Sequence, residues 1–299
     1  MLFGMLHLPD DKVKKKDTAI VLLSPGVKMR VAPHRLYIKM ADFLVKLGYP
    51  VIRFDFYGSG DAEGEIELDL VADYYGSVAV GRYIDDTVSA IDWIEQHLQL
   101  NKVLLGGLCG GALTGLLSCD DARVVGVLGL GIPVNRYSAN IDKSKYITQG
   151  QLTQLRSGYI KKLFQPKSWL RLLTFQSDFR VLAKSLLQPL KKKKKNPKTE
   201  PATAESNQES SDYNSLFGDA FFKLVESQRK IIIIYSGADR LAWEFDEKFR
   251  DVYQQKLEQY KSYYELHNIE HANHILSDRT WQEEMQKIAT TWLNQHYAG

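Results

Sequence analysis

Short apolar runs, many of them rich in β-branched residues, recur along the chain and alternate with stretches of helical periodicity. Three of these runs are almost continuously apolar or glycine, which is typical of central strands covered on both faces: residues 19–24, 124–130 and 230–236. The other runs lie at residues 50–54, 103–106 and 262–267. Strands that alternate with helices predict an α/β fold with a mostly parallel central sheet flanked by helices.

Helices are predicted where apolar residues recur at every third or fourth position between these runs. In residues 34–47 such positions form one apolar stripe, and Gly48 ends the stretch. Residues 83–98 carry a second stripe, and residues 281–297 form a further helix. These helices are expected to supply the outer layers of the fold.

The interval from residue 132 to residue 228 contains amphipathic segments but no run that resembles a sheet strand. It predicts a helical cap insertion between two parts of an α/β core, residues 1–131 and 229–299. Within the insertion, a Lys-rich stretch at about residues 190–212 lacks aromatic side chains. Such a segment buries too little apolar surface to offset the entropy of ordering it, so a disordered loop is expected.

The residues from Gly107 to Gly111 form a Gly-Leu-Cys-Gly-Gly turn between a predicted strand and a predicted helix. This is the G-x-S-x-G nucleophile-elbow pattern with Cys109 in the serine position. Small residues on either side let strand and helix approach closely, and the start of a helix favours a thiolate. The Gly110 N–H would then face a developing oxyanion. The alternative is that Cys109 is a buried, structural cysteine on a glycine-rich turn. Cys119, which follows the next predicted helix, is expected to be inert.

An acid and a histidine follow the nucleophile in the order that an α/β hydrolase requires. Asp239 lies just after the predicted strand at 230–236, and His274 lies after the next strand. A helix N-cap is the alternative role for Asp239, and Asp246 is a weaker candidate acid. His271 is the alternative base; we favour His274 because it directly precedes the last helix.

Two loops after strands complete the candidate site. The loop after residues 19–24 would supply a second oxyanion donor, for which we choose the backbone N–H of Val27. The glycine-rich loop at residues 53–64 lacks the ending of a phosphate-binding loop and misses the dinucleotide fingerprint by one residue. We therefore interpret Asp55 and Asp61 as turn residues that support the site.

Composition narrows the class of protein. A chain of 299 residues buries one large core without disulfides or a structural metal. Its two cysteines suit a reducing cytosol, and no Cys/His cluster has metal-ligand spacing. We see no secretory signal and no apolar run near the roughly 20 residues that cross a bilayer. These features predict a cytoplasmic protein without a bound metal.

The net charge of +3 has a single source. Residues 190–210 contain six lysines and three glutamates, so the remainder of the chain is formally neutral. The charge therefore gives no reason to expect nucleic acid or a membrane as a partner.

These motifs resemble those of the α/β-hydrolases of the serine-aminopeptidase-like group. More narrowly, the chain is similar to the hydrolases associated with the exosortase A system, in Met29–Tyr37, Gly48–Phe56, the elbow and Tyr159–Leu173. The resemblance implies a helical cap, no cofactor and a catalytic triad of Cys109, Asp239 and His274. Cysteine in place of serine is the main departure from the common pattern.

The predicted function is hydrolysis or acyl transfer on a small-molecule ester or thioester, through an acyl-cysteine intermediate. Backbone N–H groups of Gly110 and Val27 would stabilise the tetrahedral intermediate. One alternative is acyl transfer like that of the polyhydroxyalkanoate synthases, which share a G-x-C-x-G elbow. Another is a binding protein on a hydrolase scaffold that has lost activity.

Overall fold

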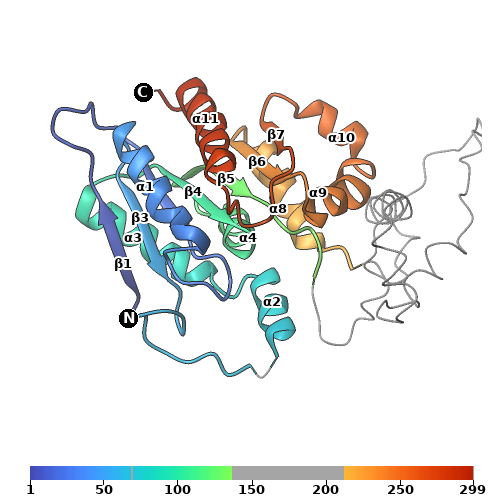
Figure 1. The fold of residues 1–299 in the computed structure, drawn as a ribbon, viewed down its shortest axis with the longest axis horizontal. Helices are drawn as coiled ribbons and strands as arrows, with labels where there is room; N and C mark the ends of the chain where they lie inside the picture. Colours follow the sequence, from blue (N-terminus) through green and yellow to red (C-terminus); the bar gives the residue numbers. More distant parts are fainter. Residues whose placement is uncertain (69, 137–211, 299) are drawn as a thin grey trace, which may run out of the picture. The chain divides into compact units, whose positions relative to one another are not determined.

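The computed structural model describes residues 1–68, 70–136 and 212–298, and all of them belong to one compact unit. The unit contains a seven-stranded sheet in the order β1-β3-β2-β4-β5-β6-β7 (Figure 1). Its strands are β1 (Phe3–His7), β2 (Ala19–Leu23), β3 (Val51–Asp55), β4 (Val103–Leu108), β5 (Val124–Leu130), β6 (Lys230–Ser236) and β7 (Tyr264–Ile269). All neighbouring strands are parallel except β1, which pairs antiparallel with β3. The mostly parallel sheet predicted from the sequence is confirmed.

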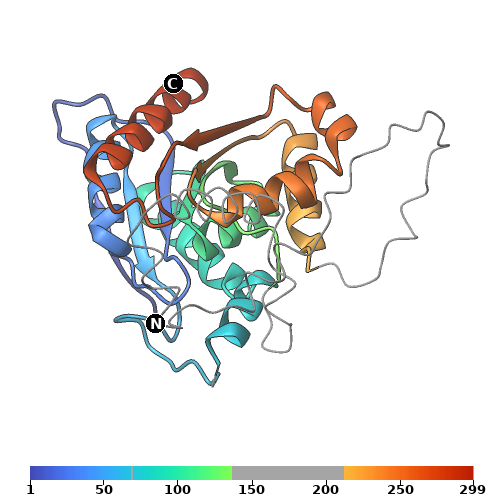
Figure 2. The ribbon, with the colours of Figure 1, turned by 45° about the vertical axis from the view of Figure 1, so that its right-hand side comes forward.

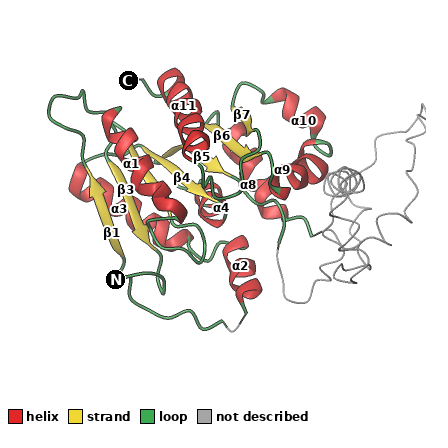
Figure 3. Cartoon of the chain, viewed as in Figure 1, coloured by secondary structure: helices red, strands yellow, loops and turns green. Residues whose placement is uncertain are grey.

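Helices cover both faces of the sheet (Figure 3). On one face lie α1 (Leu36–Lys46) and α11 (Arg279–His296). The two helices lie next to each other in both views (Figure 1, Figure 2). The other face carries α2 (Val71–Ala79), α3 (Ile84–Leu98), α4 (Gly110–Leu117), α8 (Ser215–Glu226), α9 (Arg240–Phe245) and α10 (Gln254–Gln259). The described residues also include the 3-10 turn η1 (Pro33–Arg35) and the π-helical turn η3 (Asp246–Arg250).

The apolar runs form central strands because successive residues enter different cores. In β2, Ala19, Val21 and Leu23 pack with the helices of one face, whereas Ile20 and Leu22 pack against α1 and α11. All five residues are buried. A strand buried on both faces has no polar positions, which is why its sequence reads as a continuous apolar run.

α8 extends the core beyond its predicted boundary. The sequence placed residues 132–228 in the insertion, but α8 packs in the core through the buried rings of Phe217, Phe221 and Phe222. The Phe217 and Phe221 rings each lie 5.0 Å from the ring of Phe249. The core therefore resumes at residue 212 rather than at 229. Residues 137–211, which hold most of the predicted cap and of its Lys-rich loop, lie outside the described residues.

None of the described helices combines the length and the apolar composition that a bilayer span requires.

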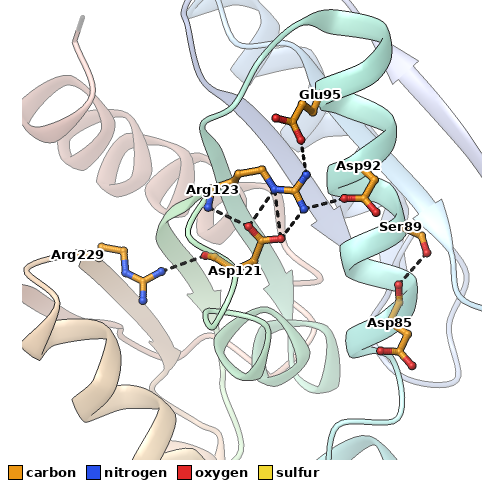
Figure 4. A network of polar contacts seen from close by, with 7 residues as sticks. All are labelled: Asp85, Ser89, Asp92, Glu95, Asp121, Arg123 and Arg229. Atoms are coloured by element: carbon orange, nitrogen blue, oxygen red, sulfur yellow. Dashed lines mark hydrogen bonds and ion pairs between the residues drawn. The ribbon is translucent and has the colours of Figure 1, made fainter.

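Arg123 ties the turn before β5 to α3 (Figure 4). Its guanidinium donates to Asp121 at 2.6 Å, to Asp92 at 2.7 Å and to Glu95 at 2.6 Å. The hydrogen bond with Asp121, which outweighs burial, raises the pKa of Arg123 and lowers the pKa of Asp121. This network joins the amino-terminal end of β5 to α3, which packs on one face of the sheet.

We expect Arg123→Ala to lower the free energy of unfolding by about 1 kcal/mol, because three carboxylates lose a partly exposed cation. Urea denaturation measures this loss. The loops at the carboxyl ends of the strands should keep their structure, since the network lies at the opposite end of the sheet. A stability unchanged within error would contradict the prediction.

Candidate active site

Cys109 occupies the single residue between β4 and α4. Its backbone has φ 56° and ψ −120°, a conformation that residues other than glycine rarely adopt. Its N–H still donates to the Leu130 carbonyl of β5 at 2.8 Å. Strain of this kind persists where neighbouring contacts enforce it, and it places the side chain at the tip of the turn.

The glycines of the elbow explain how the turn is enforced. A Cβ atom on Gly107 would lie 2.6 Å from the backbone carbon of Gly111, and a Cβ atom on Gly111 would overlap the carbonyl oxygen of Leu23. Any side chain at either position would push α4 away from β4 and β2. The two glycines therefore allow the close packing that leaves Cys109 protruding, as the sequence predicted from their spacing.

Asp239 and His274 meet across the loops that follow β6 and β7. The imidazole Nδ1 of His274 donates to Asp239 Oδ2 at 2.5 Å. The two loops are joined by backbone hydrogen bonds, from Gly237 N–H to the Ile269 carbonyl at 2.9 Å and from Ala238 N–H to the Ala272 carbonyl at 3.0 Å. The pair is therefore set by the backbone as well as by its side chains.

The second carboxylate oxygen of Asp239 has another partner. Asp239 Oδ1 accepts the N–H of Leu241 at 3.4 Å and so caps α9. A helix cap is the alternative to a site role that the sequence offers for this residue. In the structure the contacts with His274 and with Leu241 coexist, because each uses a different oxygen atom.

The imidazole of His274 lies between two partners. Burial lowers the pKa of its imidazole, but hydrogen bonds with Asp239 and then with Cys109 outweigh burial and raise that pKa to about 10. The ring lies against Gly131, where a Cβ atom would be 3.4 Å from both Cε1 and Nδ1. The three predicted triad residues are thus brought together, and Nε2 of the imidazole is the atom left to face the thiol.

The loop between β2 and α1, residues 24–35, lies beside the elbow. A Cβ atom on Gly110 would be 3.5 Å from the backbone nitrogen of Gly26. That nitrogen donates to the Ser24 carbonyl at 3.0 Å and is occupied. Among the described residues, no acceptor is bound by the N–H of Val27 or of Gly110. These two groups, chosen from the sequence, are therefore available to an oxyanion; residues 24–35 are called the oxyanion loop below.

The competing candidates have other partners. Asp246 pairs with Arg250 at 3.0 Å, and His271 is exposed to solvent. His267 pairs with Glu265 at 3.1 Å. Cys119 is buried, its thiol donates to the Gly115 carbonyl at 3.3 Å, and burial raises its pKa to about 12. None of these side chains is positioned for chemistry with Cys109.

Comparison with known proteins gives the fold. No sequence-family model matches the chain, and no curated protein matches it. Among solved structures, an α/β serine hydrolase without a lid from Xanthomonas campestris is similar over 100% of this chain and 90% of its own, with 12% identity and a TM-score of 0.53. An esterase of Pyrococcus furiosus matches over 99% and 92%, with 15% identity and a TM-score of 0.56. The proline iminopeptidase of Mycobacterium smegmatis matches over 99% and 95%, with 14% identity and a TM-score of 0.55.

The fold is that of the α/β hydrolases.

One residue that supports the candidate site was missed from the sequence. Arg30 donates its backbone N–H to the buried Asp55 at 2.5 Å, and its guanidinium bridges Asp55 and Asp61, the latter at 2.6 Å. Its cation also lies 4.4 Å from the Phe3 ring centroid. The two acids thus hold the oxyanion loop against the glycine-rich loop after β3. Only their roles as turn residues were predicted, because nothing in the sequence pairs them with Arg30.

A separate hollow of about 520 Å³ lies beside β1, away from the triad. Met5, Leu6, Phe54 and Trp93 are among its lining residues, and no side chain among those that line it is ionisable. Met1 also lines it, and its terminal ammonium pairs with Glu63 at 2.7 Å. Within the described part of this α/β-hydrolase unit, no group of three or more metal-ligating side chains is found either.

Proposed function

We propose that the protein transfers an acyl group from a small-molecule ester or thioester, with Cys109 as the nucleophile. The observation that carries the proposal is the chain of contacts from Cys109 through His274 to Asp239. The α/β-hydrolase fold supports it, as do the names of two structural neighbours, an esterase and a proline iminopeptidase.

In the first half-reaction the Cys109 thiolate attacks the carbonyl carbon of the substrate. The electrons of the carbonyl bond move to its oxygen, where the N–H groups of Gly110 and Val27 stabilise the negative charge. When the carbonyl re-forms, the bond to the leaving group breaks, and the leaving alkoxide or thiolate takes a proton from the His274 imidazolium. The product is an acyl-thioester on Cys109 and a neutral imidazole.

In the second half-reaction an acceptor resolves the acyl-cysteine. His274, now neutral, removes a proton from water or another nucleophile as it attacks the thioester carbonyl. The tetrahedral intermediate then expels the Cys109 thiolate, which regains its imidazolium partner. Asp239 keeps the imidazole in the tautomer that presents Nε2 to the reacting atoms and stabilises its charged form.

The proposal extends to features outside the described site. It includes the predicted helical cap, now confined to residues before 212, and the narrower likeness to exosortase A-associated hydrolases. It also includes a cytoplasmic location, which the two free cysteines support because thiols persist in a reducing compartment.

The test is to capture the intermediate. We expect p-nitrophenyl acetate to add one acetyl group to the protein within the first turnover, detected by intact-protein mass spectrometry, and peptide mapping to place it on Cys109. Neutral hydroxylamine should remove the group, as it does from thioesters.

Two cysteine variants make the test specific. Cys119→Ala should form the adduct like the wild type, whereas Cys109→Ala should form none. No adduct and no turnover with any of a series of acetyl to octanoyl esters and thioesters would defeat the proposal and favour a binding role for the scaffold.

A further inference from the structure

Tyr37, the second residue of α1, is completely buried between the sheet and α11, and its hydroxyl reaches the ends of two strands. The hydroxyl donates to the Leu23 carbonyl of β2 at 2.7 Å and accepts the N–H of Leu108 of β4 at 2.6 Å. Leu108 directly precedes Cys109, and Leu23 directly precedes the oxyanion loop. One oxygen atom thus binds the residue before the oxyanion loop and the residue before the elbow cysteine, the two segments that form the proposed oxyanion hole.

The hydroxyl replaces a backbone hydrogen bond that the sheet lacks between β2 and β4. β2 and β4 are paired from Ala19 with Val103 to Leu23 with Gly107, and the pairing ends there because β2 gives way to the loop. The N–H of Leu108 therefore has no strand carbonyl on that side, and a buried N–H without an acceptor is costly. Burial raises the pKa of Tyr37, so the phenol keeps the proton that it donates to Leu23.

The oxyanion loop needs external support because its backbone is strained. Ala32, His34 and Arg35 have φ values of 57°, 54° and 58°, each costing on the order of 1 kcal/mol or more for a non-glycine residue. Tyr37 is fixed to both ends of this loop: its hydroxyl binds Leu23 at the start, and its N–H donates to the Val31 carbonyl near the end at 3.2 Å.

A second hydroxyl supports the start of the loop from the other side. The buried Ser24 Oγ donates to the Phe54 carbonyl of β3 at 2.6 Å. The loop start is therefore held between β3 and β4 by side-chain hydroxyls rather than by strand pairing.

We propose that Tyr37 is a positioning residue for the oxyanion hole, whose hydroxyl fixes the Val27 N–H of the loop relative to the Gly110 N–H of the elbow. The inference rests on the proposed function, since only a reaction that develops an oxyanion uses this distance. Tyr37 touches no reacting atom; it acts through the backbones of Leu23 and Leu108.

The experiment compares two reactions of Cys109 in Tyr37→Phe. Acylation by p-nitrophenyl acetate passes through an oxyanion, whereas alkylation by iodoacetamide requires the thiolate but forms no oxyanion. We expect acylation to slow by roughly 10- to 100-fold, mainly in kcat with KM nearly unchanged, because a displaced donor loses transition-state stabilisation. Alkylation should stay within about twofold of wild type.

Tyr49→Phe is the matched control. Tyr49 is equally buried in the same core, and its hydroxyl donates to the Tyr297 carbonyl at 2.8 Å, away from the elbow. Loss of this hydroxyl should also lower stability but leave both reactions of Cys109 unchanged. Circular dichroism at the assay temperature checks that each variant is folded.

Each outcome decides the inference. Slow acylation with normal alkylation in Tyr37→Phe alone supports it; acylation at the wild-type rate, or equal slowing of both reactions, overturns it. If the wild type itself forms no acyl-enzyme, the proposed function fails and this inference falls with it. If Tyr37→Phe does not fold, Ser24→Ala provides the same comparison. Selective slowing of acylation then supports the inference that side-chain hydroxyls position the oxyanion loop, and an unchanged rate overturns it.

Discussion

Replacing His274 with alanine is expected to slow alkylation of Cys109 by iodoacetamide at pH 6.5 by roughly 100-fold. The raised pKa of His274, about 10, keeps its imidazole protonated at this pH, and the cation stabilises the thiolate beside it. Cysteine reacts as the thiolate, so losing the neighbouring cation should slow its alkylation. The rate of alkylation as a function of pH, followed by mass spectrometry, measures the change.

His271→Ala is the matched control for this prediction, because His271 is an exposed histidine in the same loop. It should leave the pH profile of alkylation unchanged. Cys109→Ala should not react under the same conditions, since Cys119 is buried. Superimposable pH profiles for wild type and His274→Ala would contradict an imidazolium–thiolate pair.

The same histidine makes stability depend on pH. In the folded protein the pKa of His274 is raised from 6.5 to about 10, so the folded state binds this proton more tightly than the unfolded state. The resulting stabilisation is complete below pH 6.5 and is lost as the pH rises through about 10. Urea denaturation should therefore show that the stability difference between wild type and His274→Ala shrinks over this range.

Asp239→Asn should lower kcat/KM for ester substrates by roughly 10³- to 10⁴-fold while the protein remains folded. The variant removes the negative charge and allows the imidazole to adopt the wrong tautomer, which is the effect of this change in Ser-His-Asp enzymes. Asparagine caps helices as well as aspartate does, so α9 should begin at the same residue. Steady-state kinetics and the thermal unfolding midpoint are the two measurements.

Asp246→Asn separates a triad acid from a nearby carboxylate. Asp246 is the first residue of η3, directly after α9, and its partner is Arg250 rather than a histidine. Its substitution should change kcat/KM by no more than about threefold. Equal losses in the two variants would mean that Asp239 acts only through the local structure.

The strands of the core were predictable because burial on two faces leaves a strong signal in the sequence. β2, β5 and β6 are almost wholly apolar, and the structure places them inside the sheet. β1 was missed because it is a short edge strand, exposed over four of its five residues, and its pairing with β3 is decided by a distant segment. α8 was assigned to the insertion because its phenylalanines are recognisable as core residues only when α4 and β6 are already in place.

The candidate site was partly predictable for a similar reason. The elbow is a local pattern, since Gly107 and Gly111 restrict the backbone within five residues of sequence. The choice between His271 and His274 depended on a register between loops that is set by the backbone bonds of Gly237 and Ala238, which no local pattern reveals. Arg30 and Tyr37 act on residues far along the chain, and their roles follow only from the fold.

Asp239 caps α9 with one oxygen atom and binds His274 with the other, so a substitution can remove the second contact and keep the first. A single base change converts an aspartate codon into an asparagine codon, and the cap on α9 survives it. Selection for a folded protein would not remove such a change, so this position is free to drift once catalysis is no longer needed. In genome surveys, relatives that retain the elbow cysteine but carry asparagine or serine at this position would be the first to test for a non-enzymatic role.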